Sequence, residues 1–188
     1  MGIIKTTYYV HGTTTDNERG LVTGWAHGEL SEIGKRQCLE LGKLVKGRKH
    51  DVVFCSDLKR AMDSTKLIFG SRLQIIRDKR LRECNYGDLT RAESGKVDLM
   101  AAQHIEKPFP KGESYMDVEA RMREFLKWLS GQAFGDVAIV AHKAPQLALD
   151  VLLKGRTWKQ AIEEDWRLKE PKEWQPGWVY VLSRENNF

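Results

Sequence analysis

Short apolar runs alternate with helix-like segments along almost the whole chain, and this alternation limits the fold more than any other feature. Strands that alternate with helices build a parallel or mostly parallel sheet with helices on both faces. We therefore expect an α/β fold, while the order of the strands does not follow from this pattern. The predicted strands, rich in β-branched and aromatic residues, are 3–10 (IIKTTYYV), 51–55 (DVVFC), 73–78 (LQIIRD), 136–141 (DVAIVA) and, at an edge, 177–182 (GWVYVL).

Apolar residues at helical spacing mark the segments between these strands. A helix is predicted from Ser31, whose hydroxyl suits an N-cap. Further helices are predicted over residues 57–69 and 114–129 and near Pro145, because proline suits the first helical position. Residues 81–112, which contain several glycines and prolines, are predicted to be rich in loops. The apolar positions of the helix that begins at Ser31 are Cys38, Leu41, Leu44 and Val45.

Length and composition favour one globular domain over residues 1–188, with 41% hydrophobic and 30% charged residues. No apolar run approaches the roughly 20 residues that cross a bilayer, so no membrane association is expected. The 31 basic and 26 acidic residues are interspersed, which gives little reason to expect nucleic acid binding. Three separated cysteines, Cys38, Cys55 and Cys84, favour a reduced, cytoplasmic protein without a zinc site. A monomer and a homodimer are both compatible with the sequence.

Polar side chains with chemistry suited to phosphate follow three of the predicted apolar segments. His11 follows the first strand, residues 56–60 follow the second, and His142 follows DVAIVA. Ligands of such sheets collect at the carboxyl ends of the strands, where helix N-termini also point. An imidazole can attack phosphorus, and the guanidinium of Arg60 matches phosphate oxygens. Each of these residues alone is more simply explained as a hydrogen-bonded loop residue or as a member of an ion pair than as a functional group. Their joint occurrence at the strand ends is what favours a phosphate site.

Six ordered motifs carry a resemblance to a known family. They are HGTTTDNE, GELSEIGKRQCLELG, CSDLKRAMDST, LRECNYGDL, GESYMDVEARMREFL and VAIVAHKAP, and together they span the chain from Ile3 to about Leu153. In this order they resemble the histidine phosphatase superfamily, the phosphoglycerate mutase-like group. The resemblance implies a three-layer αβα fold with a mostly parallel central sheet, and phosphoryl transfer through a phosphohistidine.

The resemblance also implies a role for individual residues. His11 matches the nucleophile, Arg60 a phosphate-clamping arginine, and Glu83 the proton donor to the leaving oxygen. His142 matches a second histidine that holds the transferring oxygens, and no metal or other cofactor is required. We further expect a bond from the second ring nitrogen of His11 to a backbone carbonyl of the glycine turn, which would set the tautomer. The remaining matches lie in the first motif, HGTTTDNE. Thr14 and Asn17 match polar positions that line the pocket, and Gly12 is the glycine after the nucleophile.

The sequence departs from the family at two positions beside the histidines. The first motif of the family normally begins Arg-His-Gly, whereas this chain has Val10 before His11. Loss of one pre-organised donor of this kind costs about 10²–10³ in rate. Lys143 stands where the family usually has glycine after the second histidine. It either returns a positive charge to the pocket, as a point charge rather than a fork, or points into solvent.

The function expected from these observations is hydrolysis of a small phosphorylated metabolite. A mutase is a second possibility, although mutases of this family tend to be longer than this chain. A catalytically weak or inactive phosphate-binding protein is a third possibility, because Val10 replaces an arginine that the resemblance implies. The joint presence of His11, Glu83 and His142 favours an enzyme, because a protein that only binds phosphate needs neither a nucleophile nor an acid.

Two groups of residues near the expected pocket have no single role assigned from the sequence. Lys107 and Lys111 lie in a segment that could border the entrance, although exposed lysines are normally solvated. The tryptophans of the C-terminal part are expected to be mainly packing residues because each buries a large apolar area. They are Trp158, Trp166, Trp174 and Trp178.

The two departures generate the first testable prediction. If Lys143 compensates for the lost arginine, Lys143→Ala lowers phosphatase activity and Val10→Arg raises it, since each substitution changes the positive charge available to phosphate. Steady-state hydrolysis of an aryl phosphate by the two variants measures both effects. A harmless Lys143→Ala together with no gain from Val10→Arg would rule out compensation by this lysine.

Overall fold

A mixed sheet forms the centre of the molecule in the computed structural model, which describes residues 2–168 and 177–186. Within these residues the sheet has five strands in the order β3-β2-β4-β1-β5. The first four are parallel to their neighbours and β5 runs antiparallel to β1, at the edge, as the sequence predicted. The strands are β1 (Ile3–Val10), β2 (Val52–Cys55), β3 (Ile75–Arg77), β4 (Asp136–Ala141) and β5 (Trp178–Ser183).

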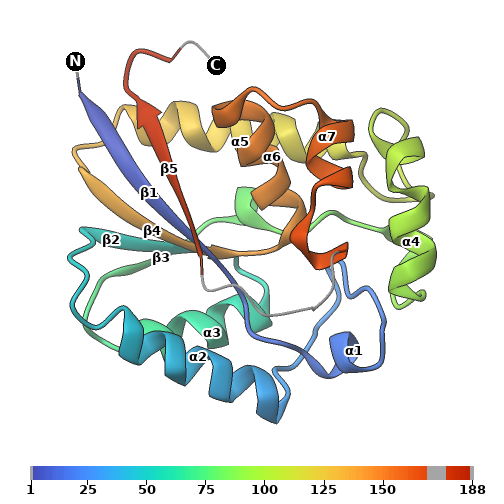
Figure 1. The fold of residues 1–188 in the computed structure, drawn as a ribbon, viewed down its shortest axis with the longest axis horizontal. Helices are drawn as coiled ribbons and strands as arrows, with labels where there is room; N and C mark the ends of the chain where they lie inside the picture. Colours follow the sequence, from blue (N-terminus) through green and yellow to red (C-terminus); the bar gives the residue numbers. More distant parts are fainter. Residues whose placement is uncertain (1, 169–176, 187–188) are drawn as a thin grey trace.

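Helices cover both faces of this sheet (Figure 1), which confirms the expected three-layer α/β architecture with a mostly parallel central sheet. In Figure 1, α2 and α3 lie on one side of the strands and α5 and α6 on the other, while α1 and α4 lie beyond one end. None of the helices within residues 2–168 and 177–186 is both long and apolar enough to span a membrane. The helices are α1 (Thr15–Glu18), α2 (Glu32–Leu44), α3 (Lys59–Phe69), α4 (Ser94–Met100), α5 (Tyr115–Ser130), α6 (Lys143–Lys154) and α7 (Trp158–Glu163).

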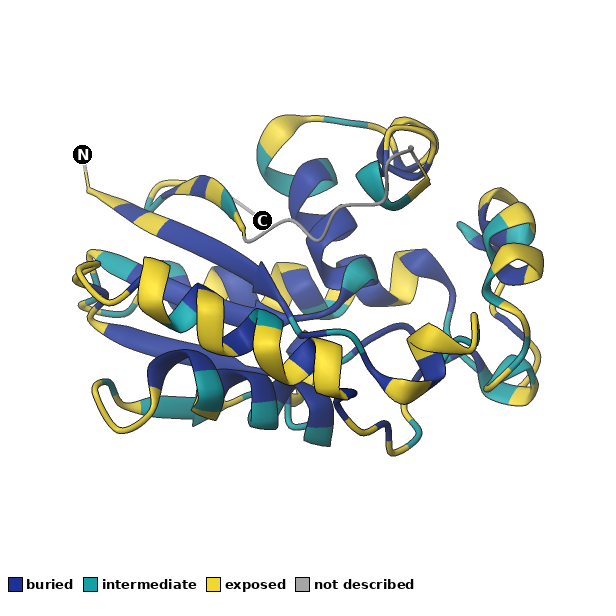
Figure 2. Ribbon diagram, turned by 60° about the horizontal axis from the view of Figure 1, so that its bottom comes forward, coloured by how far each residue is buried: buried dark blue, intermediate teal, exposed yellow. Residues whose placement is uncertain are grey.

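The two faces of the sheet bury separate cores, and side-chain alternation along β1 contributes to both. Tyr8 and Val10 pack in the larger core with residues of α5 and α6, whereas Tyr9 packs in the smaller core with residues of α2 and α3. Figure 2 shows the central strands as buried and the outer faces of the helices as exposed. Because successive side chains of a strand point to opposite faces, β1 joins the two cores and holds its last residue in place.

The predicted N-cap Ser31 is confirmed, Ser114 is an N-cap that the sequence analysis did not name, and the predicted position of Pro145 differs. Ser31 caps α2 by accepting a hydrogen bond from Gly34 N, and Ser114 forms a capping box with Asp117 at the start of α5. The N-cap of α6 is His142, so Pro145 occupies the third helical position and not the first. Proline is tolerated there because the N–H groups of the first turn have no partner within the helix.

Several expectations need correction. Leu44, expected on the buried side of α2, is 73% exposed because it lies at the end of the helix, while the neighbouring Val45 is buried. The segment predicted as loop contains α4, where Val97 is the buried residue. The segment after α6 contains α7, which the sequence analysis did not predict. Both helices are short, so few apolar positions could repeat at helical spacing. Of the four tryptophans, Trp174 lies outside the described residues.

Helix α2 approaches the loop after β1 so closely that Gly34 leaves no room for a side chain. An added Cβ at this position would lie 1.9 Å from the carbonyl oxygen of Thr13. Ser31 N donates to the same carbonyl. The glycine therefore allows α2 to set the path of the chain just after His11.

We predict that Gly34→Ala destabilises the protein by at least about 1–3 kcal/mol, because the backbone must move to relieve the overlap. Denaturant unfolding measures the change. Gly95→Ala is the matched control, since Gly95 also lies in a helix but has open space around its Cβ position. The control is expected to gain about 0.5–1 kcal/mol from helix propensity. Equal effects of the two substitutions would contradict the packing argument.

Candidate active site

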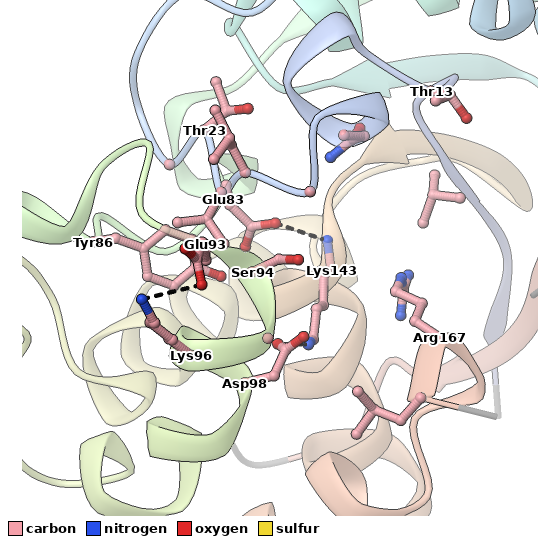
Figure 3. A pocket seen from close by; sticks show the side chains of 18 of the residues that line it. Thr13, Thr23, Glu83, Tyr86, Glu93, Ser94, Lys96, Asp98, Lys143 and Arg167 are labelled. Carbon is pink, nitrogen blue, oxygen red and sulfur yellow. Dashed lines mark hydrogen bonds and ion pairs between the residues drawn. The ribbon is translucent and has the colours of Figure 1, made fainter.

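A cavity of about 950 Å³ opens at the carboxyl ends of β1 and β4. Its wall includes five of the predicted site residues, namely His11, Asn17, Arg60, Glu83 and Lys143. Figure 3 shows Glu83 and Lys143 facing the space, with side chains of α4 on one side. The parallel pairing of β1 with β4 explains the location of the cavity, since it brings the carboxyl ends of both strands to one edge of the sheet.

His11 lies directly after β1 and has a defined tautomer. Its backbone N–H donates to the carbonyl of Ala141 at the end of β4. The ring Nδ1 lies 2.7 Å from the carbonyl oxygen of Gly12, which is the contact expected from the sequence. Because a carbonyl only accepts, Nδ1 carries the proton and Nε2 keeps its lone pair. Nε2 in turn accepts a hydrogen bond from Nε of Arg60 at 3.3 Å.

Gly12 forms a turn that has no space for any other residue. An added Cβ would lie 2.5 Å from the carbonyl oxygen of Gly34 and 2.8 Å from Sγ of Cys38. Its N–H donates to Oγ of Ser64 on α3. Gly12 therefore lies between α2 and α3, and it supports the ring of His11 through its carbonyl group.

Arg60, from the first turn of α3, is held rigidly beside His11. The side chain is buried, with a residual exposure of 2%. Nη2 donates to the carbonyl of Gly24 and Nη1 to the carbonyl of Ala26. These bonds leave the guanidinium oriented before any ligand arrives. Burial lowers the pKa of Arg60 from its ordinary value, and the negative charge of Glu83 opposes this shift.

His142 caps α6 directly behind His11. The two imidazole rings have centroids 5.0 Å apart. The buried hydroxyl of Tyr8 donates to the carbonyl of His142 and accepts from its N–H, which fixes the backbone at this point. Both ring nitrogens of His142 are buried and have no hydrogen-bond partner among the described residues. The ring therefore offers an unused donor and acceptor beside the ring of His11, although His142 does not itself line the cavity.

Glu83 reaches the same cavity from a loop and is held by backbone amides. Its Oε1 accepts from Cys84 N at 2.8 Å and from Ala144 N at 3.0 Å, and its Oε2 accepts from Lys143 N at 3.1 Å. Figure 3 shows the last contact. With one N–H on Oε2, this oxygen retains a lone pair that can carry a proton.

The comparisons with known proteins address the same part of the chain. A model of the histidine phosphatase superfamily (branch 1) matches residues 10–170. The chain belongs to the histidine phosphatase superfamily. Members that resemble it include both mutases and phosphatases.

One curated relative and two solved structures are similar to this chain. A 2,3-bisphosphoglycerate-dependent phosphoglycerate mutase of Allorhizobium ampelinum is 34% identical over 168 residues, which cover 81% of this chain and 80% of the relative. A solved mycobacterial glucosyl-3-phosphoglycerate phosphatase with VO3 has a TM-score of 0.76 at 26% identity, covering 85% and 86% of the two chains. A phosphoglycerate mutase from Bacillus anthracis has a TM-score of 0.76 at 19% identity, covering 97% and 89%, and shares the fold.

The remaining predicted residues of this histidine phosphatase superfamily member differ in whether they line the cavity. Asn17 lines the wall, whereas Thr14 is buried and forms a capping box with Asn17 at the start of α1. Lys143 is neither solvated nor free, because its Nζ lies 2.7 Å from Oδ1 of Asp98 and 3.4 Å from Oδ2 of Asp165. Within the described part of the chain, no cluster of three or more His, Cys, Asp or Glu side chains could hold a metal ion.

The histidines to which the sequence analysis gave no role are accounted for by ordinary contacts. His50 pairs with Asp136 at 2.6 Å, and His104 stacks on Phe109 with ring centroids 3.9 Å apart. Neither these two nor the exposed His27 lines the cavity.

Sequence reasoning missed the part of the wall that comes from α4 and from the segment after α7. Lys96 lies in α4, and Trp166 and Arg167 lie in the short 3₁₀ turn Trp166–Leu168. By contrast, Lys107 and Lys111 are exposed and do not line the cavity. Trp158 packs as expected, with its indole N–H bonded to Glu119. No local pattern marks Arg167, so its position depends on tertiary packing.

Burial keeps both site histidines neutral. It is the largest cause that lowers the pKa of His11 to about 3, and the charges of Arg60 and Arg167 act in the same direction. The Gly12 contact opposes the shift. Burial, Arg60 and His11 likewise hold the pKa of His142 well below its ordinary value. A neutral imidazole with its lone pair on Nε2 is the form that can attack phosphorus.

These shifts predict how stability depends on pH. Between pH 6.5 and about 3 the unfolded chain binds a proton at His11 that the folded chain does not, so the free energy of unfolding falls as the pH falls. The contribution of His11 is about 1.4 kcal/mol per pH unit at most, and His142 adds to it. Denaturant unfolding at several values between pH 5 and 6.5 measures the slope.

His11→Asn is expected to reduce this slope by about the contribution of one histidine. The substitution His27→Asn serves as the control, since His27 is exposed, and is expected to leave the slope unchanged. An equal slope in the wild type and in His11→Asn would contradict the neutral, buried state of this ring.

Proposed function

We propose that this protein is a phosphatase that hydrolyses a small phosphorylated metabolite through a phosphohistidine on Nε2 of His11. The observation that carries the proposal is the state of this ring. Its Nδ1 is bonded to the Gly12 carbonyl, its pKa is lowered to about 3, and it borders an open cavity. The imidazole is therefore a neutral, oriented nucleophile at neutral pH.

In the first step, Nε2 of His11 forms a bond to phosphorus and the bond from phosphorus to the leaving oxygen breaks. The leaving oxygen takes a proton from the carboxyl of Glu83, so that an alcohol departs and not an alkoxide. The geometry that supports this role is the lone pair left on Oε2, on the wall of the same cavity as His11. Arg60 Nε, which donates to Nε2 of His11, would donate to a phosphoryl oxygen when substrate enters.

In the second step, water attacks the phosphohistidine, the phosphorus–nitrogen bond breaks, and Glu83 takes the proton from the attacking water. Inorganic phosphate leaves, and both His11 and Glu83 return to their starting states. Charge on the equatorial oxygens is stabilised by the rigid guanidinium of Arg60 and by a ring nitrogen of His142. Burial of His142 without another partner among the described residues supports this assignment.

Phosphoryl transfer to a second metabolite is the second candidate. It is favoured by the phosphoglycerate mutases that are 31–34% identical to this chain over about four fifths of its length. In such a reaction the phosphohistidine would give its phosphoryl group to an acceptor hydroxyl and not to water. Assays of 3-phosphoglycerate with 2,3-bisphosphoglycerate, compared with release of inorganic phosphate, separate the two.

We expect His11→Ala to abolish both turnover of an aryl phosphate and trapping of phosphohistidine, which survives a base quench better than an acid quench. Rapid quench with a radiolabelled substrate measures the intermediate. Wild-type protein that hydrolyses the substrate without any labelled histidine, or a fully active His11→Ala, would overturn the proposed mechanism.

Glu83→Gln tests the proton donor through the leaving group. We expect it to slow phosphohistidine formation from an alkyl phosphate, measured by rapid quench, by about 10²–10⁴, because an alkoxide needs the proton. Phosphohistidine formation from nitrophenyl phosphate should fall much less, since nitrophenolate leaves without protonation. Glu113→Gln, which changes another loop carboxylate outside the cavity wall, is the control for general loss of structure. Equal losses on both substrates would argue against an acid role for Glu83.

A further inference from the structure

Val10 stands where the resemblance to the histidine phosphatase superfamily implies an arginine, so the face of the sheet beside His11 lacks that donor. It is the last residue of β1, it lines the cavity, and its side chain packs in the core that contains Tyr8. Residues two apart in a strand project from the same face, so a guanidinium at position 10 would also project from this one. A replacement donor must therefore reach the cavity on the side of Tyr8 and Val10.

Arg167 reaches the cavity on that side. The neighbouring strand β5 pairs Trp178 with Tyr8 in antiparallel register, so the indole lies on the same face. The guanidinium carbon of Arg167 is 5.8 Å from the ring centroid of Trp178 and 4.7 Å from that of Trp166. Figure 3 shows the guanidinium of Arg167 turned toward the space that Glu83 and Lys143 also face.

The guanidinium of Arg167 is held at one nitrogen and unused at another. Nη1 donates to Oε1 of Gln146 at 3.1 Å and to Oδ1 of Asp165 at 2.7 Å. Nη2 is buried and has no hydrogen-bond partner among residues 2–168 and 177–186. An arginine that is oriented by its neighbours yet keeps a donor unsatisfied is suited to bind an anion, because an unpaired buried donor is costly.

The charge of Arg167 already acts on the nucleophile. It lowers the pKa of His11, together with the larger effects of burial and Arg60. Lys143 is less suited to the same task. Its ammonium is paired with two carboxylates, Asp98 and Asp165, whereas Arg167 shares one of these carboxylates and keeps Nη2 unused.

We propose that Arg167 supplies the second phosphate-binding guanidinium of the site, in place of the motif arginine that Val10 replaces. The proposal rests on the phosphatase function proposed above, and its ligand class is a phosphoryl group or another tetrahedral oxyanion. Arg60 would bind the anion from α3, and Arg167 from the segment that follows α7. The two cations thus reach the anion from different elements, while the His11 ring lies at the end of β1 beside that of His142, the N-cap of α6.

Binding of orthovanadate and of inorganic phosphate, measured by titration calorimetry, tests this without turnover. We expect Arg167→Gln to weaken both by about 10²–10³-fold and to lower kcat/KM for an aryl phosphate by a similar factor. Arg167→Lys keeps the charge without the fork and should lose only about 10-fold. Circular dichroism melting curves establish that each variant is folded.

Arg156→Gln is the matched control. Arg156 lies in the same part of the chain and pairs with Glu164. It does not line the cavity at the carboxyl ends of β1 and β4. We expect its anion affinity to stay within about threefold of the wild type. The double variant Val10→Arg/Arg167→Gln should recover at least tenfold of the affinity lost in Arg167→Gln, since a guanidinium then returns to the same face from β1.

The outcomes separate this proposal from the function on which it rests. Wild-type anion affinity in a folded Arg167→Gln would overturn the role of Arg167 while leaving the phosphohistidine mechanism intact. Loss of affinity in Arg167→Gln without any recovery in the double variant would also count against it, because a structural role alone would then suffice. A wild-type protein that binds neither anion would reject both the binding role and the phosphatase.

Discussion

The parallel pairing of β1 with β4 is the interaction on which the site depends. It aligns Val10 with Ala141, and the hydrogen bond from His11 N to Ala141 O extends the pairing by one residue. The residues that follow each strand, His11 and His142, are therefore placed side by side with their rings 5.0 Å apart. Tyr8 strengthens the arrangement, because its buried hydroxyl bonds to both backbone groups of His142 across the sheet. A shift of one residue between these strands would separate the two imidazoles.

Burial of this strand edge sets the chemistry as well as the geometry. Desolvation disfavours the imidazolium form of both histidines, and the fixed guanidinium of Arg60 adds to this effect. A buried guanidinium such as that of Arg60 needs hydrogen-bond acceptors. The backbone carbonyl groups of Gly24 and Ala26 supply them here. The neutral imidazole of His11 and the buried cation of Arg60 thus both depend on close packing around the end of β1, to which Gly12 and Gly34 contribute.

The C-terminal part of the chain contributes more to the cavity than its distance from the motifs suggests. Strand β5 adds antiparallel to β1 and places Trp178 opposite Tyr8. Trp166 and Arg167 line the same cavity as Val10, the last residue of β1, and the guanidinium of Arg167 lies over the ring of Trp178. The role proposed for Arg167 is physically reasonable because an anion responds to the position of a charge and not to the element that carries it.

By itself, the sequence determined the α/β class, the edge position of the last strand, and the residues that end the strands. These features follow from local patterns, namely apolar strands, the N-cap serine Ser31, and the glycine after His11. Only the tertiary structure decided the strand order, the short helices α4 and α7, the pairing of Lys143 with two carboxylates, and the approach of Arg167 to the cavity. The reason is physical. Local patterns record what each segment buries, whereas the place of Arg167 is set by contacts with Gln146 and Trp178, which no spacing along the chain encodes.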